Sequence, residues 1–177
     1  MDVTSIGPKA DATSQHGARL ERLLFVPPTS TVRITEHFHI VKDGDSVAKE
    51  LHLRHYSKYT YKDGREPRLF VGPGEKIVLL TEYGDALFVW RKFFDKFLGE
   101  KSVWCALFRN ESPTLSSQLI LEAERVANCR WPGENLYTHV RADAIKSINP
   151  GYCFKKAGWS TFGRSKSGTT VLWKEFA

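Results

Sequence analysis

The stretch that decides the fold is residues 103–159, VWCALFRNESPTLSSQLILEAERVANCRWPGENLYTHVRADAIKSINPGYCFKKAGW. Its apolar start, Val103–Phe108, is typical of a strand, and Thr114–Ala127 carries its apolar residues on one helical face. Leu136–Val140 predicts a second strand, and Tyr152–Ala157 predicts a short helical piece. We therefore expect a strand, a polar loop, a helix, a strand and a helix in succession.

The polar loop Arg109–Ser117 connects this first strand to the helix. The first N–H groups of a helix have no partner within the helix, and the helix dipole is positive at that end, so phosphate binds there. Ser112, Ser116 and Ser117 add hydroxyl donors. The sequence therefore predicts an anion site in this loop.

The residues before this stretch predict further strands and one helix. Thr31–Val41 alternates apolar and polar residues, as a half-buried strand does. Asp45 or Ser46 is expected to cap a helix whose apolar residues are Val47, Leu51 and Tyr56.

A β-hairpin is expected from Ile77–Thr81 and Ala86–Arg91. Phe93–Lys101 is expected to be an insertion with a helical turn. Ala142–Ile148 is a further short helical piece, and Ser160–Phe176 contains a turn and a last strand. The fold class is therefore α/β in the broad sense, with a mixed, mostly antiparallel sheet of six to seven strands flanked by helices.

Length and composition limit the possible classes of protein. At 177 residues with 41% hydrophobic residues, the chain is typical of one globular domain. Residues 1–22 are polar and are expected to form a flexible N-terminal tail, with residues 23–177 as the single domain. The apolar runs are too short to cross a bilayer and no signal peptide is recognised, so no membrane partner is expected.

Cysteine usage and charge indicate a location and a class of partner. The three cysteines are odd in number and form no CxxC pair, which favours reduced thiols in the cytoplasm. The net charge of +6 leaves two interpretations open. It is either ordinary basic solubility or the mark of an anionic partner, such as nucleic acid or a phosphorylated cofactor.

The segment His55–Arg68 mixes aromatic and basic residues between strong turn signals. Such a composition suits stacking on bases and contact with phosphates. The alternative is a solvated loop whose tyrosines pack on their neighbours. The candidate nucleic-acid-binding residues are Lys58, Tyr59, Tyr61, Lys62, Arg65 and Arg68.

The order of elements resembles the GNAT acyltransferase fold. In that family the strand before the long helix leads into a loop whose backbone amides hold the pyrophosphate of coenzyme A; here this is Cys105–Phe108 followed by Arg109–Ser117. The ending NPGYCFKKAGW at residues 149–159 is similar to that family's asparagine, aromatic residue and glycine–aromatic pair. The resemblance implies acetyl-CoA or another acyl-CoA as cofactor, bound by Phe108, Arg109, Asn110, Ser112, Ser116, Ser117, Asn149 and Phe154.

A narrower resemblance covers residues 51–172. It rests on the ordered strings RHYSKYTYKDG, FVGPGEKIVLL, ALFVWRKF, CALFRNES, LSSQLI, LYTHV and NPGYCFKKAGW. Together they resemble phage and bacterial GNAT-like proteins akin to the Mom group of phage DNA-modification proteins, in which an adenine amino group is altered. This implies an acyltransferase acting on a base in DNA, in the host cytoplasm if the protein is phage-encoded.

Amine acylation requires an unprotonated amine held beside the thioester and a stabilised oxyanion. A base must leave the duplex stack, or be single-stranded, to reach such a site. The position of the family's general-acid tyrosine holds Phe154 here, and Tyr152 is the nearest phenol. The candidate catalytic residues are His55, Tyr56, Glu75, His139 and Tyr152.

Simpler roles stay open for several of these residues. Glu75 is equally a solvated turn residue, His139 a hydrogen-bonded strand residue and Phe154 a core residue. Two other functions also stay open: an N-acetyltransferase acting on a small-molecule or protein amine, and a non-catalytic nucleic-acid-binding protein on the same scaffold.

Two histidine pairs raise the question of a metal. His37 and His39 share a strand face by alternation, and His52 and His55 share a helix face. Because two-histidine spacings are common by chance, no metal site is expected.

Overall fold

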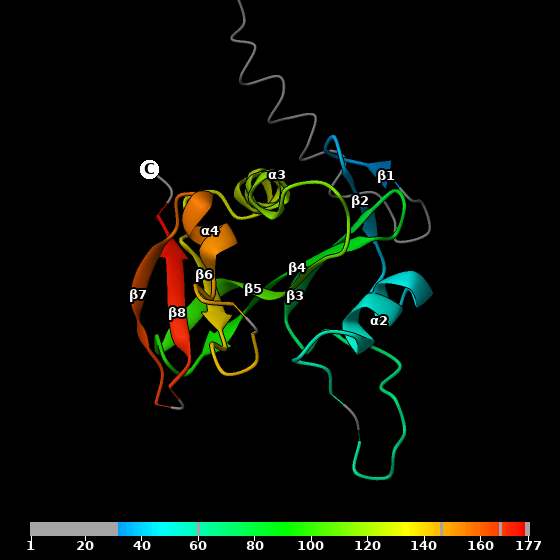
Figure 1. Ribbon diagram of the computed structural model, residues 1–177, viewed down its shortest axis with the longest axis horizontal. Helices are drawn as coiled ribbons and strands as arrows, with labels where there is room; N and C mark the ends of the chain where they lie inside the picture. Colours follow the sequence, from blue (N-terminus) through cyan, green and yellow to red (C-terminus); the bar gives the residue numbers. More distant parts are fainter. Residues whose placement is uncertain (1–31, 60, 146, 167, 176–177) are drawn as a thin grey trace, which may run out of the picture.

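The computed structural model describes residues 32–59, 61–145, 147–166 and 168–175. These residues form one eight-stranded sheet in the order β1-β2-β3-β4-β5-β6-β8-β7, with three helices packed against it (Figure 1). The elements are β1 (Val32–Arg33), β2 (Phe38–Val41), α2 (Ser46–Leu53), β3 (Glu75–Thr81), β4 (Ala86–Asp95), β5 (Glu100–Asn110), α3 (Ser116–Arg130), β6 (Leu136–Val140), α4 (Tyr152–Lys156), β7 (Ser160–Arg164) and β8 (Thr170–Lys174). The expected tail, residues 1–22, lies outside the described residues.

The sheet is mixed, which confirms the broad α/β class. Neighbouring strands are antiparallel except β5 and β6, which run parallel. Parallel neighbours need a long crossover, and α3 supplies it. Within the part of the chain that is described, no helix is long and apolar enough to cross a membrane.

Two strands go beyond those placed from the sequence. One is β7, which precedes the turn in Ser160–Phe176, where only one strand was expected. The other comes from a break in Thr31–Val41, which was expected to be one strand. The Phe38 N–H donates to the Thr35 hydroxyl at 3.0 Å, and the Ile34 N–H donates to the Phe38 carbonyl at 2.9 Å. The Thr35 side chain thus satisfies a backbone donor in a tight reversal, as threonine does in turns. The described part of the segment therefore pairs with itself as β1 and β2.

The expected insertion in Phe93–Lys101 is wrong, but its helical turn is present, because the Gly99 N–H donates to the Asp95 carbonyl at 2.8 Å. Here β4 continues to Asp95 and β5 begins at Glu100, so the hairpin is longer than expected. The Asp95 carboxylate accepts from the backbone N–H groups of Phe97 and Leu98 at 2.8 and 3.2 Å, which closes the turn. In this stretch Asp95 is buried, residues 96–99 form the turn, and Glu100 and Lys101 are exposed positions of β5.

The helices lie where the capping residues and the apolar periodicity predict them, with two exceptions. Asp45 caps α2 by accepting from the N–H groups of Val47 and Ala48 at 3.0 Å, as expected. However, α2 ends at Leu53, so Tyr56 lies beyond it. Residues 142–148 were expected to be helical, but the described ones form turns and bends.

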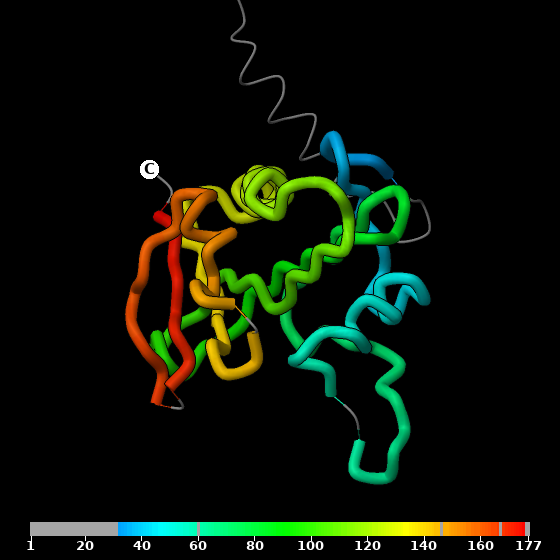
Figure 2. Tube along the Cα trace, viewed as in Figure 1, coloured from blue at the N-terminus to red at the C-terminus, as the bar shows by residue number. Residues whose placement is uncertain are grey.

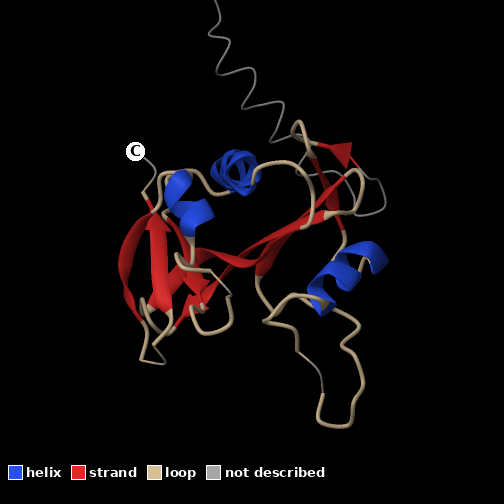
Figure 3. Cartoon of the chain, in the orientation of Figure 1, coloured by secondary structure: helices blue, strands red, loops and turns tan. Residues whose placement is uncertain are grey.

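Helices cover the sheet from both faces (Figure 3). The largest core cluster joins α3 and α4 to one face, with Trp90 of β4 fully buried at its centre. The Trp90 indole donates to the Ala123 carbonyl of α3 at 2.8 Å and stacks on Trp159 at 6.4 Å. A second cluster packs α2 against the opposite face of β3, β4 and β5.

One buried charge network ties the C-terminal half together. Glu124 of α3 is 3% exposed, and its carboxylate accepts from Lys174 Nζ at 2.6 Å and from the Trp159 indole. Lys174 also donates to the Ala157 carbonyl at 2.7 Å. The network therefore joins α3, the end of α4 and β8.

Candidate functional site

The parallel strands β5 and β6 separate along their length. They pair only through Val103–Cys105 and Leu136–Thr138, after which β5 stays with β4 and β6 stays with β8. A β-bulge lies at the same point, because Val89 pairs with Leu107 and Trp90 with Cys105, which leaves Ala106 without a partner on β4. The centre of the sheet therefore contains an opening between two strands.

A pocket of about 350 Å³ fills this opening. Its walls come from the segment after α2, from β5 and β6, and from the chain that enters α4. The volume lies within the range typical of small-molecule sites. The lining residues are His55, Tyr56, Ser57, Cys105, Ala106, Leu107, Phe108, Thr138, Val140, Ile145, Ser147, Asn149, Gly151, Tyr152, Cys153 and Phe154.

His55 is in the pocket wall, but both sides of its ring are engaged. Its Nδ1 accepts from the Ser57 N–H at 3.2 Å and lies 2.7 Å from the Ser57 hydroxyl, and the ring also hydrogen-bonds the Phe108 backbone. Burial, with Arg109 and His52 nearby, lowers the pKa of His55 to about 4. This imidazole is therefore neutral at physiological pH and ties the segment after α2 to β5.

Tyr56 and Tyr152 bring two phenols to the pocket. The Tyr56 ring packs on His55 with the centroids 4.1 Å apart, and Tyr152 is about half exposed with Lys156 Nζ 5.5 Å from its ring. Burial raises the pKa of Tyr56, and the neighbouring Cys105 thiol adds to the effect. The Tyr56 hydroxyl therefore keeps its proton at neutral pH and can donate it.

The two pocket cysteines are unsuited to nucleophilic chemistry. Burial raises the pKa of both the Cys105 thiol and the Cys153 thiol. A nucleophilic cysteine needs a lowered pKa, because the thiolate is the reactive form. Cys105 and Cys153 thus act as small apolar lining.

Three of the expected cofactor residues line the pocket. Phe108 and Phe154 meet edge to face at 6.0 Å, and Asn149 accepts a hydrogen bond from Lys155 Nζ at 3.1 Å. Phe154 is only 6% exposed and packs against Trp159 at 5.0 Å, so it belongs equally to the core. Phe108 and Asn149 are the more accessible of the three.

The loop expected to hold an anion is closed around Asn110. The Asn110 amide donates to the Thr114 carbonyl at 2.7 Å and to the Ser116 hydroxyl at 3.0 Å, and its oxygen accepts from the Ser112 N–H at 2.9 Å and hydroxyl at 2.7 Å. Ser112, Ser116 and Ser117 are outside the pocket lining. The polar groups of the loop therefore form hydrogen bonds largely with one another, which the spacing of these residues in the sequence did not indicate.

Arg109 is also engaged beside this loop. It donates to Glu111 and to the Arg54 carbonyl, and Arg54 forms a two-pronged contact with Glu111 at 2.9 Å. The two arginines hold the pKa of Glu111 down, to about 2. Because Arg54 and Arg109 share this one carboxylate, the three residues together keep one net positive charge beside the loop.

The remaining two catalytic candidates lie away from the pocket. Glu75, at the start of β3, accepts from Arg130 at 3.0 Å and from the Trp131 indole at 3.1 Å. His139 stacks on Trp104 with the ring centroids 4.3 Å apart and lies 3.9 Å from Asp95. Since Thr138 and Val140 line the pocket, alternation turns His139 to the other face of the sheet.

The basic and aromatic loop leaves the pocket at Ser57 and projects from the body of the protein (Figures 1 and 2). Tyr59 and Tyr61 meet edge to face at 5.2 Å, and Arg65 lies 5.5 Å from the Tyr61 ring. Arg65 pairs with Asp63 at 2.7 Å. Three of the candidate cations, Lys58, Lys62 and Arg68, are exposed and form no ion pair among the described residues.

Sequence reasoning missed several pocket residues, notably Ala106, Thr138 and Ser147. Their local pattern carries no signal, because they line a site only through the separation of β5 and β6. Comparison with known proteins adds no family: no protein-family model matches the chain, and neither the curated proteins nor the solved structures contain a match.

Proposed function

We propose that this chain is a GNAT-like acyltransferase that uses an acyl-CoA-type donor to modify an amino group on a nucleobase in DNA. The observation that carries the proposal is the pocket at the β5–β6 separation, with an exposed basic and aromatic loop leaving from its rim. The loop and the pocket share the segment after α2, so a base held on the loop lies near the opening.

The opening suits the arm of an acyl-CoA donor. That arm is a narrow chain with two amide groups, and a chain of this kind binds by adding hydrogen bonds along an open strand edge. Beyond Cys105, the side of β5 that faces β6 is such an edge. The α3 crossover starts close to the end of β5, so its first-turn N–H groups, at Ser116 and Ser117, are suited to the diphosphate.

The chemistry of the pocket favours a base amine over an alkyl amine. An alkyl amine such as lysine has a pKa near 10.4 and must lose a proton before it attacks a thioester. Among the described residues that line the pocket there is no carboxylate, and the one imidazole, His55, is already hydrogen-bonded. The exocyclic amino group of a nucleobase is uncharged at neutral pH and does not need that step.

In the proposed reaction the amino nitrogen attacks the thioester carbonyl. The C–N bond forms, the C–S bond breaks, and the amine proton passes to solvent. Tyr56 donates its phenolic proton to the leaving thiolate and regains one from solvent, so the protons balance. Tyr152 lies at the rim of the same pocket and is placed to position the incoming base.

One observation favours a second candidate, a nucleic-acid-binding protein without acyltransferase activity. The Asn110 side-chain oxygen occupies the N–H and hydroxyl donors of Ser112 that a diphosphate would use. The loop also lacks glycine, so its backbone approaches a diphosphate less closely. In this second candidate function, the exposed loop binds the nucleic acid and the pocket has no catalytic role.

Two measurements on the purified protein test the proposal. Calorimetric titration with acetyl-CoA is expected to show one site per chain, and mass spectrometry of nucleosides from DNA incubated with protein and acetyl-CoA is expected to show an acylated base. Tyr56→Phe should abolish most of the product and keep donor binding, whereas the control Tyr83→Phe, on an 88% exposed ring, should change neither. Tight, salt-sensitive DNA binding without acetyl-CoA binding would support the second candidate instead.

A further inference from the structure

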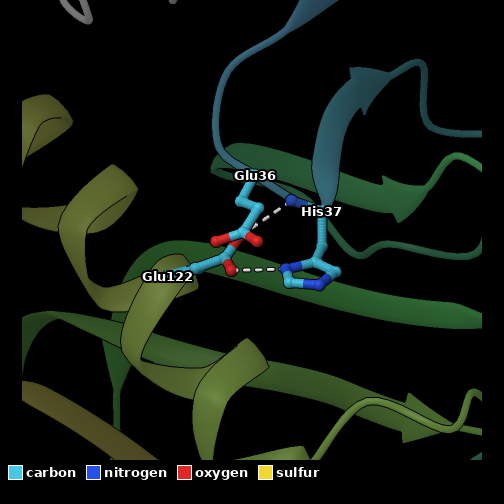
Figure 4. A group of neighbouring side chains, drawn as sticks. All are labelled: Glu36, His37 and Glu122. Carbon is cyan, nitrogen blue, oxygen red and sulfur yellow. Dashed lines mark hydrogen bonds and ion pairs between the residues drawn. The ribbon is translucent and has the colours of Figure 1, made fainter.

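A second group of chemically active side chains lies away from this pocket, where the β1–β2 turn meets α3. Glu36 and His37 come from the turn, and Glu122 comes from α3, 85 positions after His37 (Figure 4). One possible ligand atom from each of the three residues lies within 4.8 Å of the others. The fold thus gathers two carboxylates and an imidazole that sequence spacing does not connect.

Glu122 is held firmly in place. Its carboxylate oxygens lie 2.6 Å from His37 Nδ1 and 3.0 Å from the His37 backbone nitrogen. Figure 4 marks both contacts with dashed lines. Glu122 is 4% exposed, while the His37 side chain is 31% exposed and Glu36 is exposed. The group therefore has a buried, fixed member and two members that reach toward solvent.

The charge of Glu122 lacks a permanent counter-charge. A buried carboxylate is normally paired with a cation or bound to a metal. None of the described lysine or arginine side chains forms an ion pair with Glu122, whose one such contact is His37. Glu36 places a second carboxylate beside it, so the three residues together carry more negative than positive charge.

A cavity of about 520 Å³ opens onto this group. Besides the three residues, it is lined by Pro113, Thr114, Leu115, Gln118, Leu121 and Arg125. Arg125 is a positively charged residue of the cavity lining, but it does not come within ion-pair distance of Glu122. The cavity gives a bound ion room for water or an oxygen ligand beyond the three side chains.

We propose that Glu36, His37 and Glu122 form a site for a divalent transition-metal ion of the Zn²⁺ class. One imidazole with two carboxylates is a donor set that such ions accept, and ligand atoms around Zn²⁺ lie about 2 Å from the ion. Binding the ion requires the exposed Glu36 side chain to move inward and the His37 Nδ1–Glu122 contact, now 2.6 Å, to widen to about 3.3 Å. The ion takes the place of the proton between His37 and Glu122, and it cross-links the N-terminal hairpin to α3.

Calorimetric titration of the metal-free protein with Zn²⁺ alone tests the site. We expect one ion per chain and a rise in melting temperature that EDTA reverses. Glu36→Gln should weaken Zn²⁺ binding at least about tenfold, since it removes one ligand. Glu36 is exposed, so this variant keeps the fold. The matched control Glu50→Gln, an exposed carboxylate of α2, should bind as the unmodified protein does.

Co²⁺ adds a spectroscopic test that does not depend on stability. Its visible absorption reports nitrogen and oxygen ligands directly, and the bands should be lost in both Glu36→Gln and Glu122→Gln. The proposal is wrong if the unmodified protein binds no stoichiometric Zn²⁺. It is equally wrong if Glu36→Gln and Glu122→Gln bind Zn²⁺ as tightly as the control, because the ion would then reside on other histidines.

Discussion

Replacing Lys174 by methionine is the sharpest test of the buried network that joins α3 to β8. The change keeps the apolar stem and removes the ammonium group from Glu124, which is 3% exposed. Breaking a buried pair by removing one partner costs about 3–5 kcal/mol, and we expect about 3 kcal/mol because the Lys174 side chain is 23% exposed. For a chain of this length, that corresponds to a melting temperature lower by about 6–12 °C.

The loss should depend on pH in a defined direction. Burial raises the pKa of Glu124, and removing Lys174 raises it further. The folded variant then binds a proton more readily than the unfolded chain, so its stability recovers as the pH falls and the buried carboxylate becomes neutral. The difference from the unmodified protein should therefore shrink between about pH 8 and about pH 5.

Urea unfolding followed by tryptophan fluorescence measures both effects, with Trp159 inside the network as a reporter. Lys156→Met is the matched control, since Lys156 is exposed on α4. An equal loss at both pH values, or a loss no larger than that of the control, would refute the role given to Glu124.

Three further predictions concern the pocket and the loop. His55 has a lowered pKa, so the free energy of unfolding should fall by up to about 3 kcal/mol as the pH drops from about 6.5 to about 4; His55→Asn should flatten this slope in urea titrations. Tyr56→Phe should lower the acylation rate by about a hundredfold in a product assay, with acetyl-CoA affinity unchanged. Replacing Lys58, Lys62 and Arg68 by glutamine should reduce the slope of log affinity for DNA against log salt by about 2 to 3 in filter binding; an unchanged slope would place the DNA contact elsewhere.

Much of the fold follows from periodicity. Alternation predicted β6 at its observed residues, and the one-sided apolar pattern predicted α3 to within about three residues at either end. In Phe93–Lys101 the helical turn was expected, but the strand ends on either side of it were assigned to an insertion, because local composition does not distinguish a loop from the ends of two long strands. The β1–β2 reversal was missed because it depends on one threonine hydroxyl.

The candidate site was less accessible to sequence reasoning. Tyr56 and Asn149 do line the pocket, but the resemblance to a known fold supplied Asn149 rather than any local pattern. Glu75 looked free beside its glycine turn, yet Arg130 and Trp131 reach it from the end of α3. Sequence reasoning has no means of finding such partners, since they lie more than fifty positions away along the chain.

The separation of β5 and β6 also has a consequence for how the chain folds. The β3–β4 and β4–β5 hairpins close over short turns at little entropic cost, whereas β2 reaches β3 only across residues 42–74, which include α2. In the same way, β6 reaches β5 only across residues 111–135, which include α3, and parallel pairing of this kind is slow to form. Because the first long connection supplies part of the pocket wall and the second brings β6 to it, we expect the pocket to form late in folding and its walls to be among the first to exchange amide hydrogens when the native protein opens.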